Sequence, residues 1–289
     1  MSVKSVIALA ASLVLNMTPL CLAASEPSEH VFKTSDRVTL HYKKAGEASR
    51  TLVFVPGWLM PGDVFRHQMT ALSDHYRVVV LDPRGQGKSQ VKVRDMSAQR
   101  RADDVRELVR HLKLQDYVLV GWSLGVMEIL ETITRHPMPG LKGLVLIDNS
   151  IGMGPPPPQM QPGRRPARPV KPEAFRHYVG EFSKAIFKRP PEDGLIDIVQ
   201  RSATQLAPAV AWRLLDKPHH RDYYKQAVLA TSVPLWYAIT PRYRVQADEL
   251  MQLRPEASVT VFEDAGHALF VDSAGAFNAA LLDFLSRLD

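Results

Sequence analysis

The sequence is poor in cysteine, with Cys21 alone among 289 residues. One cysteine cannot form a disulfide within the chain, and it excludes a zinc site built from cysteine ligands. The sequence also lacks a Walker phosphate-binding loop, a dinucleotide-binding glycine motif and a cluster of metal-ligating side chains. After residue 24 no apolar run is long enough to span a bilayer. We therefore expect a protein that works without a metal or an organic cofactor and has no stable membrane span.

Hydrophobic residues make up 45% of the chain and charged residues 23%, with 16 glycines and 22 prolines. These proportions exclude a disordered chain, a collagen-like chain and a small disulfide-stabilised scaffold. The 36 Lys and Arg outnumber the 30 Asp and Glu, which gives a formal charge of +6. Because no basic cluster carries interleaved aromatic side chains, this surplus does not indicate a nucleic-acid partner.

The first 24 residues have the pattern of a secretory signal peptide. A positive residue, Lys4, precedes an apolar run over residues 6–22, and the small residues Ala23 and Ala24 follow. An uncleaved membrane anchor is the alternative, but the run is short and a proline interrupts it. We therefore predict a signal peptide over residues 1–24, cleaved near Ala23 or Ala24, and a periplasmic or secreted mature protein.

Short apolar runs alternate with helical patterns over most of the remaining chain. Several runs are unbroken, as expected of parallel strands that are covered on both faces. The predicted strands are Val38–Tyr42, Thr51–Val55, Arg77–Leu81, Tyr117–Gly121, Gly143–Ile147, Pro234–Ile239 and Ser258–Phe262. Apolar residues recur at helical spacing between and after them, for example over residues 105–112 and 277–288. The alternation predicts an α/β fold with a doubly wound, mainly parallel sheet.

The alternation stops between residues 150 and 231, and we predict that this segment is a helical cap. It holds 12 of the 22 prolines, and 13 Lys and Arg against 7 Asp and Glu, and it begins with a Pro- and Arg-rich stretch. Helical patterns follow around residues 175–187 and 195–206. The sheet domain would then comprise residues 25–149 and 232–289. The basic surplus of the cap fits either solvated helix surfaces or the attraction of an anionic substrate.

The sharpest motif, Gly-Trp-Ser-Leu-Gly, spans residues 121–125 and centres on Ser123. A predicted strand precedes it and a helical pattern follows it, which is the context of a nucleophile elbow. On so sharp a turn the serine adopts a strained backbone conformation, and the two glycines let neighbouring segments pass close by. The turn presents the hydroxyl at the carboxyl edge of the sheet, where ligands of open α/β sheets bind. We predict that Ser123 is a catalytic nucleophile rather than part of a structural turn.

A serine nucleophile needs a base to take its proton, and the oxyanion that it forms needs N–H donors. Of ten histidines, His267 lies in the loop between the last predicted strand and the C-terminal helical pattern. This place fits the chain order serine, acid, histidine. Leu124 directly follows the nucleophile, and Trp58 belongs to a Pro-Gly-Trp sequence after the strand Thr51–Val55. We predict that His267 is the base and that the backbone N–H groups of Leu124 and Trp58 form the oxyanion hole.

From about residue 32 to its end, the chain resembles the α/β-hydrolase superfamily. The motifs that carry the resemblance are Pro56-Gly57-Trp58, residues 82–89 (Asp-Pro-Arg-Gly-Gln-Gly-Lys-Ser), residues 102–104 (Ala-Asp-Asp), residues 121–125 and Ala265-Gly266-His267. The chain is similar above all to esterases of the aryl-esterase/perhydrolase type and of the pimeloyl-carrier-protein methyl ester esterase type. The resemblance implies structural rather than catalytic roles for Asp82 and Arg84. Epoxide hydrolases and haloalkane dehalogenases carry an aspartate in the elbow, so the serine argues against their chemistry.

The acid of the triad is where the sequence departs from this resemblance. Relatives usually carry an aspartate after the strand that corresponds to Pro234–Ile239, but here no carboxylate follows until Asp248, within a predicted helix over residues 245–253. Asp148 follows the preceding strand, and some members of the superfamily place the acid there. An acid beside the histidine loop would hold the imidazole in its useful tautomer. We predict Asp148 as the acid, with Asp248 as the alternative.

These motifs together predict an exported serine hydrolase that cleaves small carboxylic esters through a Ser-His-Asp triad. A lactonase, a thioesterase, a perhydrolase or an amidase would use the same triad, because all of them transfer acyl groups. An inactive hydrolase fold that serves as a binding protein is the alternative from another class, and the missing acid after Ile239 favours it. Trp58, Trp122 and Trp212 fit either an apolar substrate site or ordinary packing.

Overall fold

The computed structural model describes residues 27–91, 94–155, 168–191, 194–216 and 218–288. The predicted signal peptide over residues 1–24 lies outside the described residues and stays a prediction. Within the described ranges, no helix has both the length and the apolar character that crossing a membrane requires.

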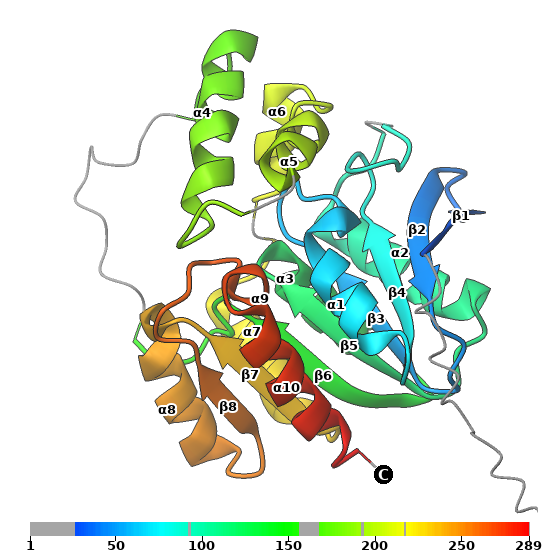
Figure 1. The fold of residues 1–289 in the computed structure, drawn as a ribbon, viewed down its shortest axis with the longest axis vertical. Coiled ribbons are helices and arrows are strands. Elements are labelled where there is room, and N and C mark those ends of the chain that lie inside the picture. The colour runs from blue at the N-terminus through cyan, green and yellow to red at the C-terminus, as the bar shows by residue number, and fades with distance from the viewer. Residues whose placement is uncertain (1–26, 92–93, 156–167, 192–193, 217, 289) are drawn as a thin grey trace, which may run out of the picture.

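The centre of the fold is an eight-stranded sheet, most of whose neighbouring strands run parallel (Figure 1). Its strands, in spatial order, are β1 (Ser28–Lys33), β2 (Thr39–Ala45), β4 (Arg77–Asp82), β3 (Thr51–Val55), β5 (Tyr117–Trp122), β6 (Leu141–Ile147), β7 (Leu235–Ile239) and β8 (Ser258–Val261). The first two strands, β1 and β2, pair antiparallel at one edge, and β2 is also antiparallel to β4. The predicted α/β fold with a mainly parallel, doubly wound sheet is confirmed.

One strand, β1, was not predicted from the sequence. Its side chains are mainly exposed, and Phe32 is the buried one. Its residues form neither an unbroken apolar run nor a strict alternation of apolar and polar positions, so the local sequence does not indicate a strand here. The strand is defined by its partner, since it pairs with β2 from Ser28 opposite Lys44 to Lys33 opposite Thr39.

Helices cover both faces of the sheet, because alternate residues of each central strand point to opposite faces. In β3, Leu52 and Phe54 belong to one buried cluster, whereas Val53 and Val55 belong to the other. The first cluster is covered by α1 (Arg66–Leu72), α9 (Leu269–Asp272) and α10 (Ala274–Leu285), and the second by α2 (Ala98–His111), α3 (Leu124–Arg135), α7 (Arg221–Ala230) and α8 (Arg244–Leu253). Burial on both faces explains the unbroken apolar sequences of the central strands.

Three helices of the predicted cap segment stand above the carboxyl edge of the parallel strands (Figure 1). They are α4 (Pro172–Ala185), α5 (Leu195–Ala203) and α6 (Pro208–Arg213). Their buried side chains form a third cluster with residues that flank the elbow and the first βα loop, including Trp58 and Leu124. The fourth helix of the segment, α7, packs on α3 and on the sheet through Tyr224 and Val228. The cap therefore rests directly on the edge where the predicted site lies.

Candidate active site

Ser123 forms the sharp turn between β5 and α3. Its backbone has φ 55° and ψ −119°, a conformation that side chains other than glycine rarely adopt. Two hydrogen bonds hold the turn: the Ser123 N–H donates to the carbonyl of Ile147 at 3.0 Å, and the side-chain amide of Asn149 donates to the carbonyl of Ser123 at 2.6 Å. The strained backbone is thus fixed from the end of β6.

The two glycines of the motif are required by close approaches of the backbone. A Cβ on Gly121 would lie 2.6 Å from the carbonyl oxygen of Gly125, and a Cβ on Gly125 would overlap the carbonyl oxygen of Val55. Real Cβ atoms do not approach backbone atoms so closely, and therefore α3 packs against β3 and β5 only with glycine at both places. This is the steric reason that the sequence pattern predicted.

His267 is held by its backbone in the loop between β8 and α9. The indole N–H of Trp122 donates to the carbonyl of His267 at 2.9 Å, and the N–H of Ala268 donates to the carbonyl of Ile186 at the end of α4 at 2.8 Å. At Gly266 a Cβ would meet the same segment, at 2.8 Å from the Ile186 carbonyl oxygen. The histidine loop therefore packs against both the elbow and the cap.

The structure brings Ser123, His267 and Asp148 together in one hydrogen-bonded series. His267 Nε2 lies 2.9 Å from Ser123 Oγ, and His267 Nδ1 lies 2.7 Å from Asp148 Oδ2. The side chain of Asp148 is 3% exposed and that of His267 is 27% exposed, so the carboxylate is buried whereas the imidazole is partly open to solvent. The hydroxyl, the imidazole and the buried carboxylate thus have the relative positions that acyl transfer requires of a nucleophile, a base and an orienting acid.

Thr240 holds the second oxygen of the Asp148 carboxylate. Its backbone N–H and its hydroxyl both donate to Asp148 Oδ1, at 2.8 and 2.7 Å. Thr240 follows β7, in the loop where relatives usually carry the acid. The loop thus supplies donors to an acid on the neighbouring strand, a role that sequence reasoning missed.

The alternative acid, Asp248, lies elsewhere. It is exposed on α8, beside the buried Ala247, and the polar contacts of the His267 ring go to Asp148 and Ser123. Of the two carboxylates weighed from the sequence, the structure places Asp148 beside the base.

The predicted oxyanion donors flank Ser123. The N–H of Leu124 is at the first position of α3, where a helix offers it no internal acceptor and where the helix dipole is positive. The loop before Trp58 passes directly against the nucleophile, since a Cβ on Gly57 would lie 2.9 Å from Ser123 Cβ. In the described part of the chain, the backbone N–H of Trp58 has no hydrogen-bond acceptor. Two unoccupied N–H groups beside one hydroxyl suit an oxyanion.

The tryptophans considered as an apolar substrate surface are mainly packing residues. The rings of Trp58 and Trp212 stack at 4.9 Å, and the indole N–H of Trp58 donates to the carbonyl of Ala211 at 2.7 Å. Trp122 is buried under the histidine, with 5.2 Å between the ring centroids. These three side chains stabilise the loops of the site through packing and hydrogen bonds.

Asp82 and Arg84 brace the loop after β4, as the resemblance implied. The Asp82 carboxylate accepts from the N–H groups of Gly62 and Lys88, at 2.6 and 2.8 Å. Buried Arg84 binds both oxygens of Asp104, at 2.6 and 2.7 Å. Neither residue contacts the triad. In the described residues, no three His, Cys, Asp or Glu side chains are grouped as a metal would require.

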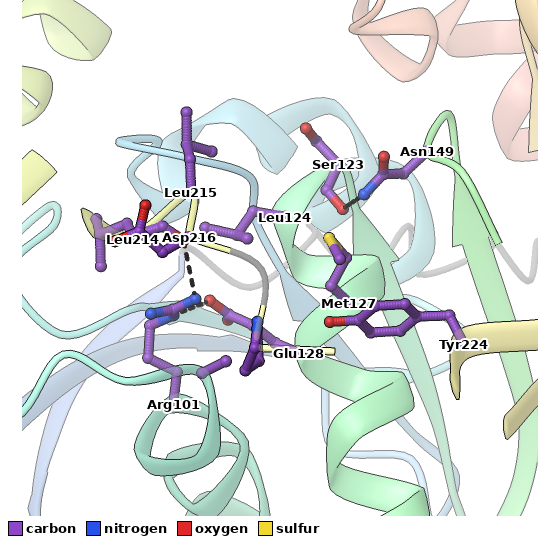
Figure 2. Close-up of a pocket in the computed structure, with 12 residues that line it drawn as sticks. Arg101, Ser123, Leu124, Met127, Glu128, Asn149, Leu214, Leu215, Asp216 and Tyr224 are labelled. Atoms are coloured by element: carbon purple, nitrogen blue, oxygen red, sulfur yellow. Dashed lines mark hydrogen bonds and ion pairs between the residues drawn. The ribbon is translucent and has the colours of Figure 1, made fainter. Parts of the chain in front are cut away.

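A pocket of about 130 Å³ opens beside Ser123 (Figure 2). It is lined by Ala98, Arg101, Ser123, Leu124, Met127, Glu128, Asn149, Leu214, Leu215, Asp216, Pro218 and Tyr224. Apolar side chains dominate, and an ion pair between Arg101 and Glu128 lies at one end, with 2.6 Å between Arg101 Nε and Glu128 Oε1. Burial raises the pKa of Tyr224, helped by the nearby Glu131 carboxylate, so this hydroxyl keeps its proton. Of these residues, the sequence analysis had singled out only Ser123 and Leu124.

Known proteins share the sequence pattern and the fold of this chain. A model of the alpha/beta hydrolase family matches residues 52–280. Over 88% of its length the chain is 27% identical to N-formylmaleamate deformylase of Pseudomonas putida, of which the match covers 95%. Over 39% of its length it is 34% identical to the bifunctional esterase/perhydrolase DCH of Acinetobacter calcoaceticus, covering 42% of that protein. The crystal structure of the esterase RhEst1 from Rhodococcus sp. ECU1013 has the same fold, with a TM-score of 0.75 and 18% identity over 91% of this chain and 100% of that one.

Proposed function

The chain belongs to the alpha/beta hydrolase family, and from this membership we propose that it is an exported serine hydrolase that cleaves carboxylic esters. The observation that carries the proposal is the hydrogen-bonded series from Ser123 Oγ through His267 to Asp148, with distances of 2.9 and 2.7 Å. A hydroxyl in this setting has a base within reach of its proton, and the base has a buried carboxylate to orient it.

In the acylation step, His267 Nε2 takes the proton of Ser123 Oγ while the oxygen attacks the ester carbonyl. The carbonyl oxygen becomes an oxyanion, and the N–H groups of Leu124 and Trp58 stabilise it. Collapse of this intermediate breaks the bond to the alcohol, which leaves with the proton from His267. Water then repeats the sequence on the acyl-enzyme and releases the acid.

Asp148 acts on His267 rather than on the substrate. Its Oδ2 accepts from the Nδ1–H of His267, which leaves Nε2 free to accept the serine proton. Thr240 fixes the other carboxylate oxygen with two hydrogen bonds, so the acid cannot rotate away from the ring. The imidazolium that forms during the reaction is stabilised by this buried negative charge.

Hydrolysis of an amide-type bond is a second candidate. A relative that matches 88% of the chain is named a deformylase, whereas the match to the esterase/perhydrolase covers 42% of that protein. The triad would serve both reactions, and the difference lies in the leaving group that His267 must protonate.

Two measurements on the wild-type protein test the esterase proposal. We expect release of 4-nitrophenol from 4-nitrophenyl butanoate, and covalent labelling by a fluorophosphonate that mass spectrometry locates at Ser123, because both need an activated serine. A folded protein that shows neither would be an inactive hydrolase fold. Turnover of an N-formyl amide with slow ester hydrolysis would favour the second candidate.

The export part of the proposal rests on the sequence of residues 1–24. We expect a bacterial host that makes the full chain to secrete it into the periplasm or medium with Ala24 or Ser25 as the first residue. Intact-mass measurement and N-terminal sequencing of the recovered protein check this. A cytoplasmic protein that keeps residues 1–24 would contradict export and leave the hydrolase proposal untouched.

A further inference from the structure

The pocket beside Ser123 is lined by the nucleophile but not by its base. It is lined by Ser123 and by the oxyanion residue Leu124, but His267 is not among its lining residues. The leaving alcohol takes its proton from His267 and therefore departs on the histidine side. The other substituent of the carbonyl carbon, the acyl chain, is directed into the pocket.

We propose that this pocket selects a short acyl chain that carries no negative charge. The proposal rests on the esterase function proposed above and names its substrate class. Of the two interpretations of the basic surplus of the cap, the proposal favours solvated helix surfaces over the attraction of an anionic substrate.

The volume of the pocket limits the length of the chain. At about 130 Å³ the pocket is small beside the roughly 300–1,000 Å³ of ordinary ligand pockets, so a short chain fits it best. The walls near the nucleophile are the apolar side chains of Leu124 and Met127, and those of Leu214 and Leu215 also line the pocket (Figure 2). An apolar chain gains from burial against these walls.

The positive charge of Arg101 is already compensated. Its Nε donates to Glu128 Oε1 at 2.6 Å, its Nη1 donates to the carbonyl of Met96, and its Nη2 donates to the carbonyl of Leu214 at 3.1 Å. Both side chains of the ion pair are 3% exposed. All three guanidinium nitrogens thus have protein acceptors, so a substrate carboxylate would find no free cation there.

The lining offers an anion no unpaired cation. Among the described lining residues Arg101 is the sole cation, and Glu128 pairs with it, while the other carboxylate, Asp216, lies 3.4 Å from Arg168 at the exposed rim. An acyl carboxylate entering the pocket would lose its hydration without gaining a partner, and it would come near two carboxylates. The pocket therefore rejects an anion chiefly through the lack of a partner.

The cations of the cap do not change this balance. No cationic side chain of the described cap residues lines the pocket. Several are engaged in surface ion pairs, namely Arg168 with Asp216, Lys184 with Glu181, Arg189 with Asp264 and Lys225 with Glu249. These four described cations are thus engaged by carboxylates outside the pocket or at its rim.

Three ethyl esters whose acyl chains have the same size test the proposal on the wild-type protein. They are ethyl 3-methylbutanoate (apolar), ethyl malonamate (polar and neutral) and monoethyl malonate (anionic), compared by kcat/KM in a pH-stat. We expect both neutral esters to exceed the anionic ester by about tenfold or more. The assays are run at about pH 8, because burial raises the pKa of Glu128 and the proposal requires its carboxylate to be ionised.

Substitution of Glu128 separates pocket charge from the intrinsic reactivity of each ester. Glu128→Gln keeps the shape but leaves Arg101 uncompensated, so we expect the ratio of kcat/KM for malonate to that for 3-methylbutanoate to rise about tenfold over wild type. Asp216→Asn, at the exposed rim, should raise it in the same direction by less, and it keeps the test valid if the buried variant does not fold. Asp222→Asn makes the same charge change at an exposed position in the first turn of α7 and should leave the ratio unaltered.

The outcomes distinguish the two proposals. If the malonate half-ester is cleaved by a Ser123-dependent activity as fast as the neutral esters, charge selection is wrong and the esterase function stands. If neither Glu128→Gln nor Asp216→Asn changes the ratio, charge selection is likewise wrong. If no ester is cleaved and a fluorophosphonate does not label Ser123, the esterase function fails and the substrate class falls with it.

Discussion

Replacing Ser123 by alanine should lower kcat for a short ester by about 10⁴-fold or more, because the acyl-enzyme can no longer form. The remaining walls, the oxyanion donors and His267 stay in place, so KM should change much less than kcat. The backbone conformation at position 123 is as strained for alanine as for serine, and the fold should therefore be retained. Chromogenic ester turnover, with circular dichroism to verify folding, measures the effect.

A matched control for this variant is Ser286→Ala, which removes an exposed hydroxyl after α10, remote from the sheet edge that carries the triad. We expect it to keep wild-type turnover and to be labelled by a fluorophosphonate at Ser123. Equal turnover by Ser123→Ala and the wild type would show that another group is the nucleophile.

Replacing Asp148 by asparagine should have an effect of similar size, about 10⁴-fold in kcat. The amide has the shape of the carboxylate but presents an NH₂ group, and Thr240 already donates twice to the other oxygen. If the asparagine oxygen faces Thr240, its NH₂ faces His267 and favours the tautomer with the proton on Nε2. That imidazole cannot accept the proton of Ser123.

The comparison that decides the acid is Asp148→Asn against Asp248→Asn. The second change alters an exposed carboxylate on α8 and should lower turnover by less than about twofold, as expected of a surface substitution. The two variants carry the same charge change, so a difference between them cannot come from net charge. Crippled turnover in Asp248→Asn, with Asp148→Asn active, would assign the acid to α8.

The sheet could be predicted from the sequence because burial on two faces leaves a strong signal. The strands β3 and β5 are buried at every position and mainly apolar, and the glycines at 121 and 125 occupy places where a side chain would collide with backbone. β1 could not be predicted in this way, because it lies at the edge and its exposed side chains carry no pattern. Its strand conformation is imposed by hydrogen bonds to β2, which a reading of local sequence does not contain.

The nucleophile and the base could be predicted, since each lies in a local motif with its own steric signature. The groups that support them could not, because they come from distant places in the chain. Thr240 meets Asp148 across 92 positions, and the indole of Trp122 meets the His267 carbonyl across 145. Only the parallel pairing of β6 with β7 makes the first of these pairs neighbours.

The pocket was the part least open to prediction. Arg101 and Glu128 are charged residues in amphipathic helices, and residues of this kind are mostly solvated. Here α2 and α3 pack together, which removes both side chains from water and pairs them beside the pocket. The sequence gives one weak indication that these two residues lie near the site, which is their position. Arg101 directly precedes the Ala-Asp-Asp motif, and Glu128 lies one turn after the elbow.

The hydrogen bond between the Ala268 N–H and the Ile186 carbonyl joins the histidine loop to the end of α4, and it has a consequence for engineering. A cap grafted from another hydrolase would lack the backbone that packs against Gly266, and the histidine loop would lose its hydrogen bond to the cap. Replacing the cap to change substrate specificity would therefore also disturb the alignment of His267. Replacements that keep residues 186–188 native would retain the contact.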